Sequence, residues 1–523
     1  MSLLSQLLES YTSFWSSSPY TCIATTIAGL LLTSIVWAQI EQLVNYDSSQ
    51  PPMVWYWIPF IGSMIEFGIQ PLTFMKKNRA KYGDYFTFLM FGRKMTICLG
   101  VDGNFFVFNA KHSSVNAEDA YNHLTKPVFG PEVIYDVPNS VLMEQKKMAK
   151  AGLTNDSFKT YVPMIIDEVN QYVKDHWKKD SDSVDILKAV SEMIIMTASR
   201  TLLGPEIRAQ LNFGVADLYH TLDASFTPIH FLFEWLPLPS YYSCKTAHEE
   251  LNRIFGKIIK NRRENPREDY SDMLDVFMSY KYKNGNSLTD IQVTNMLIAI
   301  LMAGQHTSSA TTTWSLLNLA NNRKLINDTF NSMKESMGGD LPYPEYDDLK
   351  SMPFLDNIVN ETLRLRSPII QIMRKVTKPV PVPGTQYVIP AGNFIIASPT
   401  ITQIDPAHFP DPETYNPSRW NTTLPEEQEA GKTKEDSMVD YGFGAVNYKS
   451  SRSPFLPFGA GRHRCIGEQF AFVQIKTILY TLLKNFEFEL DPTRGMPEPD
   501  FNSMVILPAA PVLLKYTRRS SKA

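Results

Sequence analysis

The chain has 523 residues, of which 44% are hydrophobic and 12% aromatic, so it can form a sizeable core. Its formal net charge is only -4, and this gives no indication of a nucleic-acid-binding surface. Its 4 cysteines lie far apart, which argues against a disulfide scaffold and favours a reducing compartment.

The first predicted element is an apolar helix near the N-terminus. No charged residue occurs between Tyr11 and Ile40, and residues 22–40 suffice to cross a hydrocarbon layer about 30 Å thick. A buried core helix and a cleaved signal peptide are the alternatives, but no basic segment precedes the helix and no cleavage site stands out. We expect a retained membrane anchor, whose orientation the flanking charges do not specify.

The residues after the anchor predict a domain boundary. Residues 48–52 read S-S-Q-P-P, which is typical of a stiff linker. We therefore expect an anchor and linker over residues 1–50 and one catalytic domain over residues 51–523. Within that domain, residues 85–100 suggest a small β-rich part, and helical patterns dominate beyond residue 140. The polar stretch 421–453 reads as a surface insertion.

Residues 290–321 predict a long helix without a proline, apolar on nearly every face at its centre. Such a helix is buried. Gly304 costs it about 1 kcal/mol relative to alanine, so something should offset that cost. One explanation is a glycine that serves packing. The other is that Gly304 removes bulk beside a ligand, while Thr307 diverts a backbone carbonyl or opens the helix locally.

The stretch E-T-L-R-L-R-S-P ends at Pro368, after a helix that is expected to begin near Pro353. Glu361 and Arg364 are three residues apart, so they share a helix face and can form an ion pair. Alone this is a weak signal, because most such pairs are solvated surface contacts.

One cysteine, Cys465, lies in the glycine-rich stretch F-L-P-F-G-A-G-R-H-R-C-I-G-E-Q-F. No second cysteine is near enough for a zinc site or a redox pair. The three residues before it are cationic or titratable and a helix is predicted after it, and both features lower the pKa of a thiol. A thiolate is a good metal ligand, and haem iron can be held by a single cysteine. A buried cysteine without a ligand is the alternative.

These motifs, in this order, resemble those of the cytochrome P-450 superfamily. Residues 458–467 are similar to its haem-binding loop, F-x-x-G-x-[RH]-x-C-x-G, and Arg419 in N-P-S-R-W is similar to the arginine that completes a triad with Glu361 and Arg364. The resemblance implies a mainly helical fold with haem b between the long central helix and the helix after Cys465. It implies Cys465 as the iron ligand, with these loop residues around the haem: Phe458, Gly459, His463 and Gly467.

Further stretches resemble the sterol 14α-demethylase branch. The segment A-G-Q-H-T carries His306 where most members of the superfamily have an acid, as this branch does, and the resemblance implies that His306 and Thr307 relay protons. Residues 117–147 are similar to the loop between the second and third helices of this branch. The likeness implies haem propionate contacts from Tyr121, Lys146 and Arg374. It implies a sterol cavity lined by Phe129, Tyr135, Phe231, Ala303, Gly304 and Met504.

The implied activity is three successive oxygen insertions that remove the 14α-methyl group of lanosterol or eburicol as formic acid, leaving a 14–15 double bond. It implies O2, electrons from an NADPH-cytochrome reductase, sensitivity to azole inhibitors, and a single-pass endoplasmic reticulum protein with a cytosolic catalytic domain. A monooxygenase for another lipid or xenobiotic remains an alternative, as does a haem protein that only carries electrons or senses gas.

One departure concerns Ile370 and Gln371, where fungal members generally have histidine and serine. This stretch is more similar to the animal pattern, whereas the stretch 440–459 and the opening of the catalytic domain resemble fungal members. We interpret the chain as fungal-like with a variant pocket.

Overall fold

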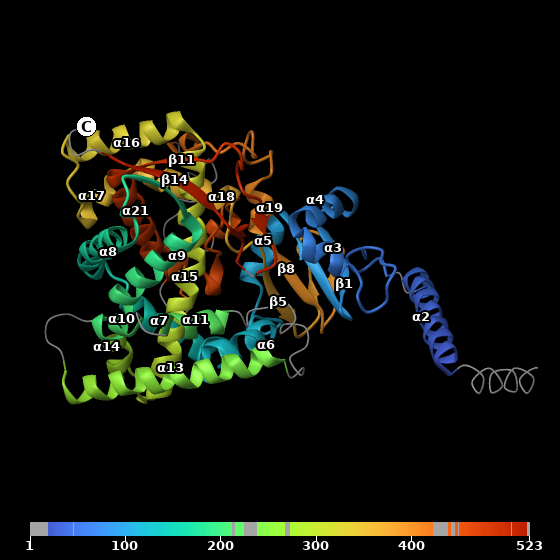
Figure 1. Cartoon of the computed structure of the whole chain (residues 1–523). Helices are drawn as coiled ribbons and strands as arrows, with labels where there is room; N and C mark the ends of the chain where they lie inside the picture. The colour runs from blue at the N-terminus through green and yellow to red at the C-terminus, as the bar shows by residue number, and fades with distance from the viewer. Residues whose placement is uncertain are drawn as a thin grey trace, which may run out of the picture.

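The computed structural model describes the following residues: 19–44, 47–211, 215–223, 238–266, 272–421, 438–440, 445–447, 449–503 and 505–519. Most of these residues form helices that gather around one long central helix, with a smaller sheet on one side and an apolar helix projecting beyond the sheet (Figure 1). The prediction of a mainly helical chain with a small β-rich part is therefore confirmed.

The N-terminal helix α2 (Pro19–Val44) is long and apolar enough to cross a membrane. Its 26 residues rise about 39 Å, and its large side chains stand exposed, with Leu30 at 66% and Trp37 at 68%. Because an exposed apolar helix of this length is costly in water, the helix is consistent with the expected membrane anchor.

The segment expected to be a stiff linker is hydrogen-bonded to the rest of the protein. Ser49 O accepts a hydrogen bond from Val388 N at 2.7 Å, and Pro52 O accepts one from Thr87 N at 2.8 Å. Prolines donate no backbone hydrogen bond but keep their carbonyls as acceptors. The segment is therefore docked along the sheets and is not a free spacer.

The main sheet has the strand order β1-β2-β8-β5-β3. Its strands are β1 (Tyr85–Met90), β2 (Arg93–Cys98), β3 (Val115–Asn116), β5 (Ile372–Val376) and β8 (Phe394–Ala397). Phe91 and Gly92, both with positive φ, join β1 to β2 in a tight turn whose twist suits a hairpin. β5 pairs antiparallel with β8 and carries Arg374. A second sheet has the order β11-β14-β4, with β4 (Ser181–Asp185), β11 (Phe486–Leu490) and β14 (Leu513–Arg518).

The central helix α15 (Asp290–Ala320) begins at a capping box. Thr289 Oγ1 accepts a hydrogen bond from Gln292 N, and Gln292 Oε1 accepts one from Thr289 N. This satisfies donors that a helix N-terminus otherwise leaves unpaired. Most of the helix is buried, as the sequence predicts.

The other helices lie around α15 and the main sheet. They are α3 (Met64–Ile69), α4 (Pro71–Tyr82), α5 (Gly100–Asn109), α6 (Glu118–Phe129), α7 (Asn139–Ala151), α8 (Asn155–His176), α9 (Ile186–Ala198), α10 (Pro205–Gln210), α11 (Ala216–Asp223), α13 (Pro239–Glu264), α14 (Met273–Ser279), α16 (Arg323–Met337), α17 (Tyr346–Lys350), α18 (Pro353–Leu365), α19 (Pro399–Gln403) and α21 (Glu468–Asn485).

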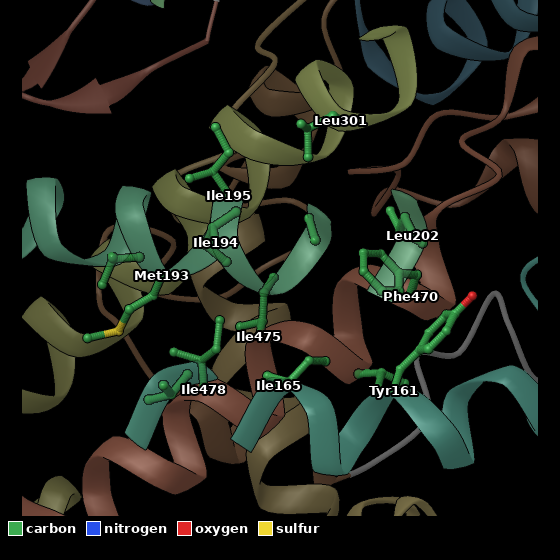
Figure 2. Close-up of a cluster of buried hydrophobic side chains, with 14 of the residues drawn as sticks. Tyr161, Ile165, Met193, Ile194, Ile195, Leu202, Leu301, Phe470, Ile475 and Ile478 are labelled. Atoms are coloured by element: carbon green, nitrogen blue, oxygen red, sulfur yellow. The ribbon is translucent and has the colours of Figure 1, made fainter. Parts of the chain in front are cut away.

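The largest hydrophobic cluster lies where α8, α9, α15 and α21 meet. Figure 2 shows Ile165 of α8, Ile194 of α9 and Ile475 of α21 pointing toward one another in it. Leu301 of α15 and Phe470 of α21 belong to the same cluster. Close packing of these helices fixes the middle of α15 relative to the start of α21, which are the two places where the sequence predicts the functional residues.

Three sequence expectations fall wholly or mostly outside the described residues. They concern Phe231, Met504 and the insertion 421–453, of which the structure describes Asn421, residues 438–440 and 445–447, and 449–453.

Candidate haem and substrate site

The loop that carries Cys465 is a tight turn before α21. Cys465 N donates a hydrogen bond to Phe458 O at 3.0 Å, and Arg464 N donates one to Gly461 O at 3.1 Å. Gly461 has φ 64°, and a Cβ there would lie 2.5 Å from the carbonyl oxygen of Phe108. Only glycine fits this position, because it combines a left-handed conformation with close backbone contact.

The side chain of Cys465 is accessible to solvent, but protein atoms fill most of the space around the thiol. Burial raises its pKa, and the backbone N–H of Gly467 and the charges of Lys146 and Arg464 oppose this only in part. The sequence expectation of a lowered pKa is therefore wrong for the free thiol, because burial outweighs the helix terminus and the cations. A metal ion deprotonates a coordinating thiol outright, so the raised pKa is compatible with ligation.

The middle of α15 presents a second open surface. Ala303 is exposed although Leu301 and Met302 are buried, and a Cβ added to Gly304 would meet nothing within 4 Å. Thr307 Oγ1 donates a hydrogen bond to Ala303 O at 2.9 Å, and the helix continues unbroken through this turn. Of the two expected effects of Thr307, the structure therefore shows the bond to a backbone carbonyl and not a local opening.

Buried positive charge gathers beside the Cys465 loop. Arg374 is 5% exposed, its Nη1 donates a hydrogen bond to the carbonyl of Met373 at 2.7 Å, and it forms no ion pair with a carboxylate of the described residues. The pKa of His463 is well below its usual range, because of burial and then the nearby cations Arg374, Lys146 and Arg462. A buried charge is costly unless it is paired. An anionic group with two carboxylates, such as haem, therefore fits this site.

Lys146 of α7 is placed differently from a simple propionate ligand. Its Nζ donates to the carbonyls of Arg462 at 2.7 Å and Arg464 at 2.9 Å, so it holds the loop on both sides of His463. Burial lowers the pKa of Lys146 to about 7. Its expected role toward a haem propionate stays a prediction, whereas its contact with the loop is a finding that the sequence did not indicate.

Tyr121 of α6 lies over the same charged region. Its hydroxyl accepts a hydrogen bond from Met373 N at 2.7 Å, so its own proton is available to another acceptor, and its ring stacks on Tyr135 at 5.3 Å. Tyr135 in turn lies 6.2 Å from the ring of His463. The structure thus brings Tyr121, Tyr135, Arg374 and His463 together.

Replacing Tyr121 with phenylalanine should weaken haem retention. A hydrogen bond to a charged group is worth about 1.5 to 3 kcal/mol, so we expect haem to transfer to apomyoglobin at least about tenfold faster. Tyr346→Phe removes a comparable hydroxyl that bonds Asn155 far from the loop, and it should leave the transfer rate unchanged. Equal rates for both variants would show that Tyr121 does not contact haem.

The remaining predicted cavity residues that the structure describes are Phe129, Ala303 and Gly304. Phe129 ends α6 and packs against the main hydrophobic cluster, which also contains buried residues of α15. α6 and α15 contact each other, so Phe129 and the open turn at Ala303 belong to adjoining elements. This placement is consistent with a cavity wall, and their contact with substrate stays a prediction.

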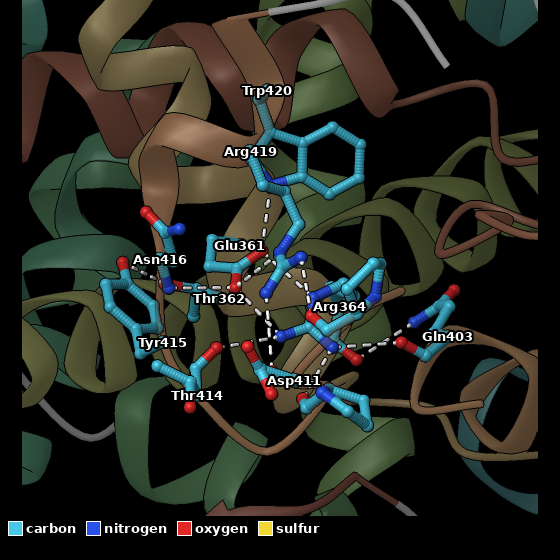
Figure 3. A network of polar contacts seen from close by, with 12 residues as sticks. Glu361, Thr362, Arg364, Gln403, Asp411, Thr414, Tyr415, Asn416, Arg419 and Trp420 are labelled. Carbon is cyan, nitrogen blue, oxygen red and sulfur yellow. Dashed lines mark hydrogen bonds and ion pairs between the residues drawn. The ribbon is translucent and has the colours of Figure 1, made fainter. Parts of the chain in front are cut away.

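Glu361 is the centre of a buried polar network (Figure 3). Its carboxylate accepts from Arg364 Nη2 at 2.8 Å and Nε at 2.9 Å, and from Arg419 Nε at 3.2 Å. Trp420 Nε1 and Asn416 N also donate to it, both at 2.9 Å. The three residues that the sequence groups together are therefore joined directly.

The network reaches the Cys465 loop through Gln403, which the sequence analysis missed. Gln403 O accepts from Arg364 Nη1 at 3.0 Å, and Gln403 Oε1 accepts from Leu456 N at 3.2 Å. Leu456 lies two residues before Phe458, at the start of the loop. A lone glutamine gives no motif, whereas Trp420, also missed, could have been suspected because it follows Arg419 directly.

Comparisons with known proteins agree with this geometry. The family profile described as cytochrome P450 matches residues 52–516. The solved structure "Retinoic acid bound cyanobacterial CYP120A1" has a TM-score of 0.73 at 20% identity and covers 91% of this chain and 100% of that chain. At that identity the likeness shows the fold alone.

Closer relatives are fungal enzymes. The eburicol 14-alpha-demethylase of Penicillium italicum is 43% identical over 95% of this chain and 98% of its own. The lanosterol 14-alpha demethylase of Cunninghamella elegans is 42% identical over 99% of this chain and 100% of its own. The lanosterol 14-alpha demethylase erg11 of Schizosaccharomyces pombe is 44% identical over 92% of this chain and 96% of its own. The chain belongs to the cytochrome P450 family, and within it to the sterol 14α-demethylases.

Proposed function

We propose that the chain is a haem-thiolate monooxygenase that removes the 14α-methyl group of a sterol such as lanosterol or eburicol. The observation that carries this proposal is the identity of 42% to 44% with demethylases over 92% to 99% of the chain. The alternative of a haem protein that only carries electrons or senses gas has no such support, and neither has a different lipid or xenobiotic substrate.

The organisation of the chain follows from this function. Residues 1–50 form the membrane anchor and the linker after it, and residues 51–523 form the catalytic domain, on the endoplasmic reticulum membrane with the domain in the cytosol. The exposed apolar helix α2 supports an anchor, and a membrane location suits a sterol, which dissolves in lipid. The electron donor is an NADPH-cytochrome reductase in the same membrane.

The residues around the Cys465 loop hold the cofactor. Cys465 would ligate the iron, and Arg374 and Tyr121 would meet the propionates. Lys146 fixes the loop that presents the thiol. Glycines in the loop let its backbone lie close to Phe108, and they would also allow it to approach the flat macrocycle closely. Haem b, when bound, supplies the oxidising power to insert oxygen from O2 into a C–H bond, with two electrons for each insertion.

The protein directs this chemistry to one methyl group. Phe129, Tyr135, Phe231, Ala303, Gly304 and Met504 line the sterol cavity. Gly304 leaves room beside α15, and the hydroxyl of Thr307 with the ring of His306 delivers protons there. Three insertions convert the methyl group to an alcohol, then an aldehyde, and finally to formic acid, with a 14–15 double bond left in the sterol. Azoles should compete with the sterol for the same cavity.

The proposal is tested by reconstituting the full chain with haem, reductase and NADPH. Lanosterol and eburicol should each give a substrate-binding difference spectrum, and at least one should yield the 14-demethylated, 14–15 unsaturated sterol by mass spectrometry. Oxidation at another carbon would favour a different lipid monooxygenase, and the absence of any oxidised product would favour a non-catalytic haem protein.

Thr307→Ala should uncouple electron supply from product formation. Proton delivery by a placed side chain contributes about a hundredfold or more to a reaction rate. We therefore expect NADPH consumption to continue, hydrogen peroxide to accumulate, and sterol product to fall by roughly that factor. Thr294→Ala removes a hydroxyl with the same bond to a carbonyl four residues earlier on α15, and it should remain coupled. Unchanged coupling in Thr307→Ala would refute its role.

A further inference from the structure

One face of α2 is covered by protein near its C-terminal end, although most of this helix is exposed. Ala38 is buried, and Ile35, Gln39 and Gln42 are half-buried, whereas the neighbouring Trp37 is exposed. The four covered residues are spaced three or four apart, so they share one face of the helix. The last turns of α2 therefore lie against the rest of the protein along one stripe.

Two glutamines on this face bond the backbone of Tyr56. Gln42 Oε1 accepts a hydrogen bond from Tyr56 N at 3.1 Å, and Gln42 Nε2 donates one to Tyr56 O at 3.0 Å. Gln39 Nε2 donates to Tyr56 O at 3.2 Å and to Trp57 O at 3.3 Å. An amide side chain has both the donor and the acceptor that a backbone C=O and N–H require. Gln39 and Gln42, here called the glutamine lock, therefore join α2 to a segment at least 14 residues further along the chain.

The segment that receives the lock is itself fixed to β1. Val54 N donates to Thr87 O at 2.7 Å before Tyr56, and Ser63 N donates to Leu89 O at 2.8 Å after it. Because Tyr56 lies between two points that are bonded to β1, the lock connects α2 to the main sheet.

The surface beside the lock is apolar and exposed. Its large side chains, here called the apolar collar, are Trp55, Trp57, Ile58, Phe60, Ile65 and Ile69. Ile65 and Ile69 are four residues apart on α3, so they share one face of that helix. Figure 1 shows α2 projecting from the side of the molecule on which α3 and β1 lie. Tryptophan is enriched where a bilayer meets water, so the composition of the collar suits a membrane surface.

The lock lies at the depth that such a contact requires. Gln39 is five residues before Val44 at the end of α2, which corresponds to a rise of about 8 Å. Apolar groups of proteins bound at a membrane surface reach about 5 to 10 Å into the boundary between headgroups and acyl chains. The collar therefore lies where α2 leaves the bilayer.

We propose that the glutamine lock holds α2 and the catalytic domain as one rigid unit, and that it thereby places the apolar collar in the membrane leaflet at the C-terminal end of α2. The partner of the collar is lipid at the boundary between headgroups and acyl chains. This inference rests on the proposed function, in which α2 is the membrane anchor. The orientation of the catalytic domain on the bilayer is then set by the fold, because the domain does not swing on a flexible linker.

The first test measures the angle between the haem plane and the membrane, by polarised absorption of the full-length haem-loaded protein in oriented phosphatidylcholine bilayers. The original protein should show one narrow distribution of angles. The double variant Gln39→Leu/Gln42→Leu removes the lock but keeps the anchor apolar, and its distribution should broaden toward random. Thr33→Val/Ser34→Ala is the matched control, because these hydroxyls bond carbonyls within α2 itself, and it should match the original.

The second test uses phosphatidylcholine with a carbene-generating photolabel near the start of an acyl chain, and mass spectrometry of the labelled peptides. In the original protein both α2 and residues 55–69 should be labelled. Hydrogen bonds of this kind are worth about 1 kcal/mol each, so labelling of residues 55–69 should fall at least about threefold in Gln39→Leu/Gln42→Leu. Labelling of α2 and the ferrous carbon monoxide spectrum should not change.

The two measurements separate failure of the lock from failure of the anchor. An unlabelled collar beside a labelled α2 in the original protein would overturn the proposal, as would an unchanged haem angle or unchanged collar labelling in Gln39→Leu/Gln42→Leu. If α2 itself is unlabelled, the anchor in the proposed function fails. Hydrogen exchange at Tyr56 N then still tests the lock, and exchange no faster in the double variant than in the original would overturn it.

Discussion

Replacing Cys465 with histidine should abolish sterol demethylation and the long-wavelength absorption band of the ferrous carbon monoxide complex. Thiolate ligation pushes electron density onto the iron and favours cleavage of the O–O bond, and a neutral imidazole does this far less. Because Arg374, Tyr121 and Lys146 lie on other elements, the variant should still retain haem. We expect product formation to fall below detection, a loss of at least about a thousandfold.

The spectrum makes this prediction independent of activity. Cys98→Ala is the matched control, because Cys98 is buried in the sheet, and it should keep both the band and the activity. A thiolate-type band in Cys465→His, or its absence from the original protein, would refute the assignment of Cys465 as the ligand.

Glu361→Gln should prevent formation of a stable, haem-loaded protein. Five donor groups converge on this buried carboxylate, and two of them belong to Arg364, which is fully buried. The glutamine amide has the same shape as the carboxylate, but its NH2 group would face some of these donors and could not accept their hydrogen bonds. The loss of the negative charge also leaves the charges of the two arginines uncompensated. Breaking a buried ion pair costs about 3 to 5 kcal/mol. That is a large part of the about 5 to 15 kcal/mol by which most proteins are stable.

The measurement is the yield of haem-loaded protein and its melting temperature after expression with added haem precursor. Glu487→Gln is the matched control, since Glu487 pairs at the surface with the largely exposed Arg323 and such pairs contribute little. A Glu361→Gln protein with normal haem content and melting temperature would show that the network does not support the Cys465 loop.

The local sequence predicted those features that depend on neighbouring residues. Helix α15, the β-rich stretch 85–100 and the helix that carries Glu361 and Arg364 were expected from patterns within one segment, whereas the pairing of β1 with β2 in a hairpin was not. Membership of the family was predictable because the glycines and Cys465 occur at fixed spacing. The role of each remaining site residue came from the resemblance alone.

Features that depend on distant contacts were not predicted. The pKa of Cys465 was expected to be lowered by its neighbours in the sequence, but burial by other elements raises it. Gln403 is 53 residues from its partner Leu456 in the Cys465 loop, and Lys146 is 316 residues from its partner Arg462. No motif in the segments around Gln403 and Lys146 indicates these hydrogen bonds. The hydrogen bonds of Ser49 and Pro52 also go to distant residues, Val388 and Thr87, which lie in strands. The composition of the linker gives no information about these strands.

The most direct test of the account uses a sterol labelled with carbon-13 in its 14α-methyl group, incubated with the reconstituted, haem-loaded chain, reductase and NADPH. The account predicts one labelled formate for each 14–15 unsaturated sterol formed, with release blocked in the Cys465→His variant. Oxygenated sterols that keep the label, with no formate at any time, would contradict it.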